Sequence, residues 1–207
     1  MFITLEGIEG CGKSTQAALL HKYIQSSGRE VILTMEPGGS RLGRELRRIL
    51  LSMDNQDISE ETELFLYLAD RAQHMHSLII PALTAGKVVI SDRFTDSTIV
   101  YQGYGRGIEI STLHQLNALA TRGIVPDLTI LLDLPAETGL KRALNRNIEQ
   151  NLTSSEGRFE AESLEFHKIT RQGYLDWASN NKDRIMTIDA THDVDTIFNS
   201  IKAQIEK

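Results

Sequence analysis

The sequence predicts an α/β protein with three layers, in which a five-stranded parallel sheet carries helices on both faces. Five short apolar runs lack the polar alternation of a half-solvated strand, which is typical of strands buried on both sides. Segments with helical periodicity separate these runs, so each connection is long enough for parallel pairing. No internal repeat or low-complexity segment interrupts this order. We therefore expect residues 1–207 to form a single domain.

Each expected strand is an apolar run bounded by turn-forming residues. The first run begins at Phe2, and the other four are Val31–Met35, Lys87–Asp92, Asp127–Leu134 and Ile185–Ala190. Glu36-Pro37-Gly38-Gly39 stops the second strand as a rigid turn, and Pro126 marks the entry to the fourth.

The expected helices have apolar residues at helical spacing and recognisable ends. Gly28 is a plausible C-terminal cap for the first helix, and Ser40 an N-terminal cap for the second. The helices are expected at Gln16–Ser27, Ser40 to about Ser52, Glu60–Ile80, Asp96–Gln102, Ser111–Arg122, from Ala136 onward, Glu162–Asn180 and Val194–Glu206. A polar stretch at Asn145–Gly157 separates the helix from Ala136 and the helix that follows it.

The strongest motif is the glycine-rich loop Gly7-Ile8-Glu9-Gly10-Cys11-Gly12-Lys13-Ser14-Thr15, hereafter the phosphate loop. It has the form Gly-x-x-x-x-Gly-Lys-Ser between a strand and a helix, which is the context of a P-loop nucleotide site. Its backbone N–H groups can converge on phosphate oxygens, and the helix N-terminus adds partial positive charge. Lys13 would reach the β- and γ-phosphates, and the Ser14 hydroxyl would contact Mg²⁺. The sequence therefore predicts the P-loop NTPase fold.

Composition narrows the function classes. The 207 residues include 22 basic and 28 acidic ones, and the net charge of −6 argues against broad nucleic-acid binding. The single cysteine, Cys11, excludes an internal disulfide framework and a multi-cysteine metal site. No secretory signal pattern is visible, and no apolar run approaches the ~20 residues of a membrane span. We expect a soluble, cytoplasmic protein without a membrane partner.

Polar residues follow the expected strands at the sheet edge where ligands of such folds bind. The segments Glu6–Ser14, Glu36–Gly39, Asp92-Arg93 and Asp189 onward are therefore expected to converge. Asp92 could orient water around Mg²⁺ and Arg93 could bind phosphate in a bidentate manner, although the pair could instead cap the next helix. Asp133, at the end of the fourth strand, is a lower-ranked candidate for the same acidic role.

Other candidates come from single positions. Glu9 would repel a triphosphate unless it points away toward a second ligand such as a sugar hydroxyl; it could also simply face solvent. Tyr67 and Arg71 lie four residues apart on one helix face, where a ring and a guanidinium can bracket a flat base. Alone, Tyr67 is more readily a core residue. Gln102, beside Thr98 and Tyr101, could read an amide-like edge.

The stretch Asn145–Glu160 contains Arg146 and Arg158 among polar residues. A mobile flap that brings arginines over a phosphoryl group would stabilise the charge on the transferring oxygens. A disordered surface loop is the alternative. Cys11 is most simply a small residue that fills the phosphate loop.

Together these segments resemble the thymidylate kinases, nucleoside monophosphate kinases that phosphorylate dTMP to dTDP with ATP. The matching pieces are the phosphate loop with Glu6, Glu36-Pro37-Gly38-Gly39, Ala69-Asp70-Arg71, Ser91-Asp92-Arg93-Phe94, Tyr101-Gln102-Gly103 and Pro126-Asp127-Leu128-Thr129. They fall in order along the chain, and the combination is far more specific than the phosphate loop alone. Gly10 and the arginines of the stretch from Arg146 to Glu160 match the bacterial type.

The resemblance implies a role for each matched residue. The phosphate loop from Gly7 to Thr15 would bind ATP, with Lys13, Asp92, Arg93 and the lid residue Arg158 catalytic and with Ser14 and Asp92 at Mg²⁺. The residues implied for dTMP are Glu9 at the 3′-hydroxyl, Arg47 and Arg93 at the phosphate, Arg71, Thr98 and Gln102 at thymine, Tyr67 as the stacking ring, Tyr101 near the 2′ position, and Glu36.

The resemblance also implies direct in-line transfer in dTTP biosynthesis, a homodimer and a mobile lid at about residues 145–160. Two departures concern the site. Met35 stands where bacterial relatives usually have arginine, and Tyr67 where they usually have phenylalanine. The lid also looks longer and more polar than usual.

Two other functions remain open on the sequence. A kinase for another nucleotide or for a nucleoside would share most of these motifs. A nucleotide switch such as a small GTPase would share the phosphate loop, but it normally carries Asn-Lys-x-Asp. The chain lacks that motif, because Asn181-Lys182-Asp183 has the wrong spacing.

Overall fold

The computed structural model describes residues 1–205 and confirms the predicted fold class. The five strands are β1 (Phe2–Glu6), β2 (Val31–Met35), β3 (Val88–Asp92), β4 (Leu128–Asp133) and β5 (Ile185–Asp189). They form one sheet in the order β2-β3-β1-β4-β5, and every neighbouring pair is parallel. The connections after β1 and β3 leave in opposite directions, which opens a crevice beyond their carboxyl ends.

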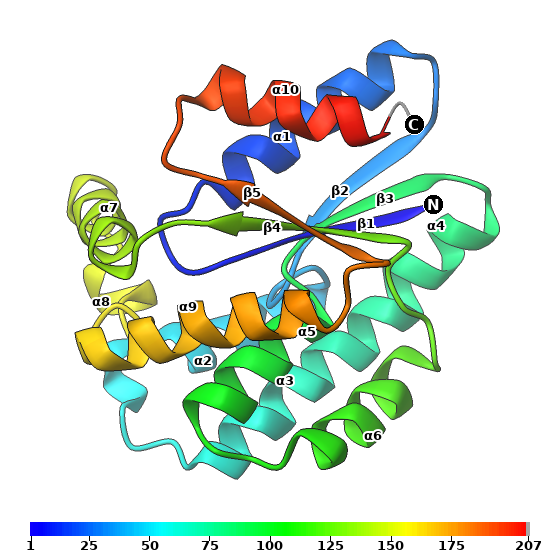
Figure 1. The fold of residues 1–207 in the computed structure, drawn as a ribbon. Coiled ribbons are helices and arrows are strands. Elements are labelled where there is room, and N and C mark those ends of the chain that lie inside the picture. Colours follow the sequence, from blue (N-terminus) through cyan, green and yellow to red (C-terminus); the bar gives the residue numbers. More distant parts are fainter. Residues whose placement is uncertain (206–207) are drawn as a thin grey trace.

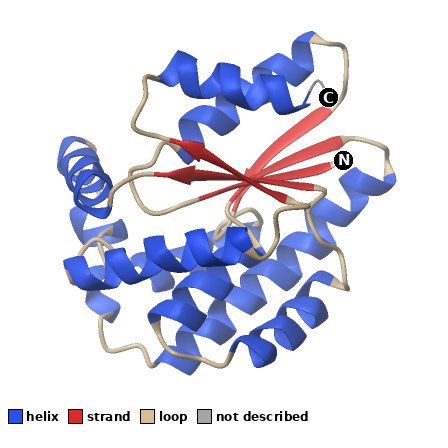
Figure 2. Cartoon of the chain, viewed as in Figure 1, coloured by secondary structure: helices blue, strands red, loops and turns tan. Residues whose placement is uncertain are grey.

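Helices cover both faces of the sheet, as Figures 1 and 2 show. On one face, α1 (Lys13–Ser26) packs against α10 (Val194–Ile205). The other face carries a larger group of helices. They are α2 (Arg41–Leu51), η1 (Met53–Asn55), α3 (Glu60–His74), η2 (Met75–Ile79), α4 (Ile80–Thr84), α5 (Thr95–Thr98), η3 (Ile99–Gly105), α6 (Ile110–Thr121) and α9 (Leu164–Ser179). Near the carboxyl ends of β4 and β5 lie α7 (Ala136–Glu149) and α8 (Thr153–Glu156) (Figure 1).

Several predicted helix limits are wrong. The first helix begins at Lys13 rather than Gln16, so Lys13 and Ser14 belong to its first turn. The expected helix to Ile80 continues to Thr84 through the π-helical segment η2. The helix from Asp96 starts at Thr95 and ends in a second π-helical segment, η3. The last helix matches through Ile205, and its expected end at Glu206 lies outside the described residues.

The polar stretch from Asn145 also departs from expectation. Its first five residues continue α7, because Gly139, Ala143 and Asn147 form a buried face at four-residue spacing, on which Gly139 lies against Ile8 and Glu9 of the phosphate loop. Tertiary packing thus extends a helix that the composition alone would end earlier. The following helix begins at Leu164, where the Ser163 side chain accepts a hydrogen bond from the backbone N–H of Phe166.

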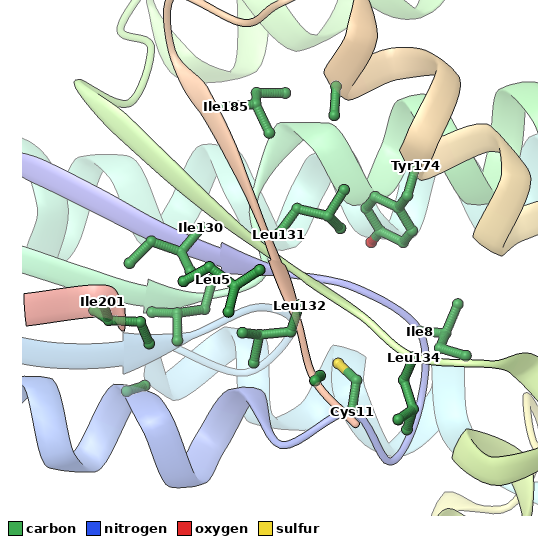
Figure 3. Packing of buried hydrophobic residues seen from close by; sticks show 14 of the residues in the cluster. Leu5, Ile8, Cys11, Ile130, Leu131, Leu132, Leu134, Tyr174, Ile185 and Ile201 are labelled. Carbon is green, nitrogen blue, oxygen red and sulfur yellow. The ribbon is translucent and has the colours of Figure 1, made fainter. Parts of the chain in front are cut away.

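The main apolar core lies between the sheet and α1, α9 and α10. Leu5 of β1 and Ile130 and Leu132 of β4 are at most 1% exposed within it (Figure 3). Within residues 1–205, none of the helices is both long enough and apolar enough to cross a bilayer.

Leu5→Ala should lower the free energy of unfolding by about 2–5 kcal/mol, because it opens a cavity in the central strand. The matched control is Leu33→Ala in edge strand β2, where the side chain is 40% exposed and the expected cost is about 1 kcal/mol or less. Urea unfolding monitored by circular dichroism measures both values. Equal losses in the two variants would contradict this assignment of the core.

Candidate active site

A cavity of about 390 Å³ opens beyond the carboxyl ends of β1, β2 and β3. It lies at the crevice that the sheet order creates, and it brings together segments that are far apart in the sequence. The predicted site residues among its lining are Glu9, Gly10, Gly12, Lys13, Ser14, Thr15, Glu36, Arg47, Tyr67, Arg71, Asp92, Arg93, Thr98, Tyr101 and Gln102. Of the predicted residues, Gly7, Ile8, Cys11 and Arg158 do not line it.

The phosphate loop is held in a conformation that only glycine tolerates well. Gly10 has a φ of 70°, and a Cβ atom there would meet the Gly139 carbonyl oxygen of α7 at 2.2 Å. Gly12, with a φ of 97°, caps α1, and the first turn of that helix has neither a side-chain cap nor an acidic residue. Its free N–H groups and the helix dipole therefore favour an anion at this end of the cavity.

The side chains of Ile8 and Cys11 attach the phosphate loop to the main apolar core. Both side chains are at most 2% exposed and belong to the main core, where they lie near Leu132 and Leu134 (Figure 3). Burial raises the pKa of the Cys11 thiol, which opposes formation of a reactive thiolate. Their side chains thus shape the loop from the core, while backbone N–H groups of the loop remain available for a phosphate.

Lys13, Ser14 and Asp92 meet at the mouth of the phosphate loop. The Lys13 Nζ donates hydrogen bonds to the carbonyl oxygens of Gly7 at 3.0 Å and Ile8 at 2.8 Å. The Ser14 Oγ donates to Asp92 Oδ2 at 2.5 Å. A hydroxyl and a carboxylate side by side are oxygen ligands of the kind that Mg²⁺ prefers in phosphate sites. The donor set therefore fits Mg²⁺ carried by a nucleotide.

Asp133 lies elsewhere. Its two carboxylate oxygens accept hydrogen bonds from Nε and Nη2 of Arg171 at 2.8 Å and 3.0 Å, and it does not line the cavity. Asp92 is thus the acid that contacts the phosphate loop. The expected convergence of Asp189 is wrong as well, since its side chain is 59% exposed and outside the cavity lining.

Arg93 joins three separate elements at the cavity. Its φ of 71° turns the chain sharply after β3. Nη1 donates to Ser97 Oγ and the Tyr174 hydroxyl, both at 3.1 Å, and Nη2 donates to Glu9 Oε1 at 2.9 Å. Nη2 also donates to the Tyr101 hydroxyl at 3.1 Å. Arg93 is therefore rigidly positioned, and it is not a simple helix-capping partner of Asp92.

Glu9 faces the interior of the site, so the solvent-facing alternative is wrong. Its side chain is 11% exposed and contacts Arg93, the Tyr101 hydroxyl and His167, whose Nδ1 lies 3.4 Å from Oε2. Burial alone would raise the pKa of Glu9, but the contact with His167 and the charges of Arg93 and Lys13 lower it below its usual value. Glu9 is thus an ionised acceptor at the cavity wall.

Behind Arg93 lies a second carboxylate that does not line the cavity. Glu6 is fully buried and accepts hydrogen bonds from the Phe94 backbone N–H at 2.8 Å, the Ser97 hydroxyl at 2.6 Å and the Tyr174 hydroxyl at 2.8 Å. Burial and the nearby Asp96 raise the pKa of Glu6 to about 7. Through Ser97 and Tyr174, Glu6 holds two of the groups that position Arg93.

The far end of the cavity is built around Arg71, which is 1% exposed. Its guanidinium donates to Glu36 Oε2 at 2.8 Å, to Thr98 Oγ1 at 2.8 Å, to Asn117 Oδ1 at 2.6 Å and to the Phe94 carbonyl at 3.0 Å. These bonds use four of its five N–H donors and leave one on Nη2. Among the described residues, this donor has no protein partner and can be offered to a ligand acceptor.

Tyr67 forms part of the same wall. It packs against the main core and also lines the cavity, 6.4 Å from the Phe159 ring. Met35, which stands where an arginine is usual, also lines the cavity with 49% of its surface exposed. The cavity edge there is apolar.

The expected lid is folded over the cavity in this structure. Arg146 lies on α7, lines the cavity and bonds Glu160 at 3.0 Å. Arg158 is buried, and its Nη2 donates to Glu63 at 2.7 Å. Arg47 forms a bidentate pair with Glu156 of α8, at 3.1 Å and 2.7 Å. Three basic residues of the site are thus paired with carboxylates.

The sequence analysis missed several residues that the fold brings to the site. Arg142 of α7 and Phe159 line the cavity, while Tyr174 and His167 of α9 contact Arg93 and Glu9. In the segment Arg158-Phe159-Glu160 only the arginine is a sequence-predicted site residue. No local sequence pattern identifies His167 and Tyr174, because they contact Glu9 and Arg93 only through packing of segments that are distant in the chain.

Comparison with known proteins gives a consistent result. A sequence model of the family described as thymidylate kinase matches residues 5–201. The thymidylate kinase of Maridesulfovibrio salexigens is 60% identical over 205 residues, covering 99% of this chain and 94% of the relative. That of Oleidesulfovibrio alaskensis is 57% identical, covering 99% and 97%. The crystal structure of thymidylate kinase from Ehrlichia chaffeensis matches with a TM-score of 0.79 and 33% identity, covering 100% of this chain and 98% of that chain.

The raised pKa of Glu6 predicts a pH dependence of stability. Between its usual value of 4.5 and about 7, the folded protein holds a proton on Glu6 that the unfolded chain releases. The associated stability is fully present below pH 4.5 and is lost as the pH rises through about 7. Glu6→Gln, which resembles the protonated form, should reduce the loss by on the order of 3 kcal/mol.

Urea unfolding of the wild type, Glu6→Gln and Glu61→Gln across this pH range is the measurement. Glu61 is exposed, so its variant should keep the wild-type pH dependence. A Glu6→Gln profile parallel to the wild-type profile would show that Glu6 is ionised in the folded protein throughout.

Proposed function

The chain belongs to the thymidylate kinase family and phosphorylates dTMP to dTDP with ATP in dTTP synthesis, and we propose that it does so by direct in-line transfer in the cavity described above. The single observation that carries this proposal is that residues of the phosphate loop line one cavity together with Arg47 and Arg93. An ATP phosphate at the loop and an acceptor phosphate at the arginines would face each other. The acceptor phosphate oxygen is itself a nucleophile, so no covalent enzyme intermediate is needed.

Charge stabilisation would supply most of the catalysis. Lys13 already lies over the phosphate loop and would exchange its bonds to the Gly7 and Ile8 carbonyls for ATP oxygens. Arg93 is held by Glu9, Tyr101, Ser97 and Tyr174, so little reorganisation accompanies charge development at its guanidinium. Ser14 and Asp92 would hold Mg²⁺, which neutralises charge on the nucleotide phosphates when bound.

The nucleoside would occupy the remainder of the cavity. We propose that Glu9 accepts from the 3′-hydroxyl and that Tyr101, hydrogen-bonded to Glu9, leaves no room for a 2′-hydroxyl. The base would stack on Tyr67. Arg71, Thr98 and Gln102 would read its edge, with Glu36 holding Arg71 in place at 2.8 Å.

The lid would have to change its contacts during the reaction. Arg142 and Arg146 already line the cavity, whereas Arg158 reaches a phosphoryl group only after leaving Glu63. We propose that residues 145–160 move as the lid of a single domain and that closure excludes water. An acceptor phosphate would also compete with the carboxylate of Glu156 for Arg47.

Two properties of the assembled enzyme belong to the same proposal. We propose a homodimer, because the exposed apolar side chains of Leu42 on α2 and Phe65 on α3 lie on adjacent helices and would be covered by a second copy. We propose a cytoplasmic location, because ATP and dTMP are nucleotides of the cell interior.

A coupled ADP-release assay with MgATP tests the reaction, with dTMP, dUMP, dCMP, dGMP and UMP offered separately. We expect strong turnover of dTMP, weaker turnover of dUMP and little of UMP, because the site reads both the base and the missing 2′-hydroxyl. Preference for another monophosphate would favour the second kinase reading and overturn the roles of Tyr101 and Gln102. Tight GTP binding without acceptor-dependent turnover would favour a nucleotide switch.

Arg93→Ala should lower kcat by about 10²–10³-fold, because it removes a preorganised donor to the transferring phosphoryl group. Arg48→Ala is the matched control, since this arginine is exposed on α2 and pairs only with Glu45 among the described residues. Steady-state kinetics with MgATP and dTMP measure both. A kcat within a few-fold of the wild type in Arg93→Ala would remove Arg93 from the mechanism.

A further inference from the structure

A buried carboxylate outside the cavity lining touches the residue that is placed to read the base. Glu63, in the first turns of α3, is 1% exposed. Its Oε1 accepts from Gln102 Nε2 at 2.9 Å and from Arg106 Nε at 3.3 Å. Its Oε2 accepts from Arg158 Nη2 at 2.7 Å and from Arg106 Nη2 at 3.2 Å. Glu63 thus joins α3 to the π-helical segment η3 and to the lid.

This carboxylate can only accept hydrogen bonds. Burial alone would raise the pKa of Glu63, but its hydrogen bonds and the charges of Arg106 and Arg158 lower it below its usual value. An ionised carboxylate carries no proton to donate. Gln102 must therefore present its amide nitrogen to Glu63, because the opposite orientation would bring two acceptor oxygens together.

The orientation of the amide decides what the cavity offers to a ligand. Gln102 is 2% exposed and lines the cavity, and its Oε1 has no hydrogen-bond partner among residues 1–205. The oxygen is thus the acceptor left for a bound molecule. Beside it, Arg71 keeps one uncommitted N–H donor.

We propose that Glu63 is a positioning residue for base specificity, which fixes the Gln102 amide so that the site accepts the N3–H of a 4-oxopyrimidine and disfavours the unprotonated N3 of a 4-aminopyrimidine. This rests on the proposed function, since it requires the base to lie beside Gln102 and Arg71. Thymine offers an N–H donor at N3 and an acceptor at O4, which complement the two protein groups. Cytosine offers an acceptor and a donor at the same positions and meets both protein groups with the wrong polarity.

Glu63→Gln provides a directed test. The one remaining carbonyl oxygen at position 63 is drawn to the two arginine Nη2 groups now on Oε2, since these are the stronger donors. The new NH₂ group then replaces Oε1, gives up the 3.3 Å bond from Arg106 Nε and faces Gln102. Gln102 must turn its oxygen toward that NH₂ group, so its own N–H groups point into the cavity and can donate to the cytosine N3.

The readout is specificity, measured as kcat/KM for dTMP and as the inhibition constant of dCMP against dTMP. In Glu63→Gln we expect the preference for dTMP over dCMP to fall by about tenfold, with tighter dCMP binding than in the wild type. The fall is partial because Arg71 still presents an N–H donor, which is repelled by the donor of a 4-amino group. General structural damage would weaken both nucleotides and could not tighten dCMP.

The variants are chosen so that loss of folding does not obscure the result. Arg106→Gln is the matched control, since it removes a partner of Glu63 but leaves the bond to Gln102, and it should keep the wild-type preference. Glu63→Gln/Arg106→Gln removes one carboxylate and one guanidinium together. This double variant preserves the charge balance of the cluster. Arg158 Nη2 still draws the remaining carbonyl oxygen at position 63, so we expect the same tenfold fall even if Glu63→Gln alone folds poorly.

Gln102→Leu separates this inference from the proposed function. If Gln102→Leu leaves the preference unchanged, the base does not lie at Gln102 and the proposed base placement fails. If Gln102→Leu lowers the preference but Glu63→Gln and the charge-balanced variant do not, the base placement stands and the role of Glu63 is overturned. If Glu63 acts through Gln102, Glu63→Gln/Gln102→Leu should show no further change beyond Gln102→Leu.

Discussion

The ion pair between Arg93 and Glu9 at the cavity wall is the interaction on which the site depends. It joins the turn after β3 to the phosphate loop after β1, and Tyr101 and Tyr174 extend it to η3 and α9. Partial burial of the two charges is tolerated because each partner is also hydrogen-bonded. The same bonds that make burial tolerable fix the guanidinium where phosphate charge would develop.

A second principle is that the polar groups around the cavity are almost fully committed to one another. Arg71 uses four of its five N–H groups in hydrogen bonds to protein atoms, and Glu63 accepts hydrogen bonds from three side chains. Whatever remains uncommitted has a fixed direction and polarity. Specificity can then arise from the few polar atoms that have no protein partner. A mismatched ligand binds poorly, because rearranging a network whose hydrogen bonds are already formed costs free energy.

Carboxylates also form ion pairs with the arginines in and near the cavity. Glu156 holds Arg47, Glu160 holds Arg146 and Glu63 holds Arg158. All three arginines belong to or face the lid segment, so phosphates entering the cavity would compete with protein carboxylates for the same guanidinium groups. Under the proposed mechanism, binding of the substrates and movement of the lid would be linked through exchange of ion-pair partners.

The sequence alone determined the parallel α/β fold and the phosphate loop, because apolar runs and the spacing from Gly7 to Ser14 are local signals. It also brought Asp92, Arg93 and Arg71 forward as candidates, which the structure gathers at one cavity. Only the tertiary structure decided which carboxylate each arginine meets, that Asp133 turns to Arg171, and that Tyr174 and Glu63 support the site. These contacts join elements far apart in the chain, where no local pattern specifies a partner.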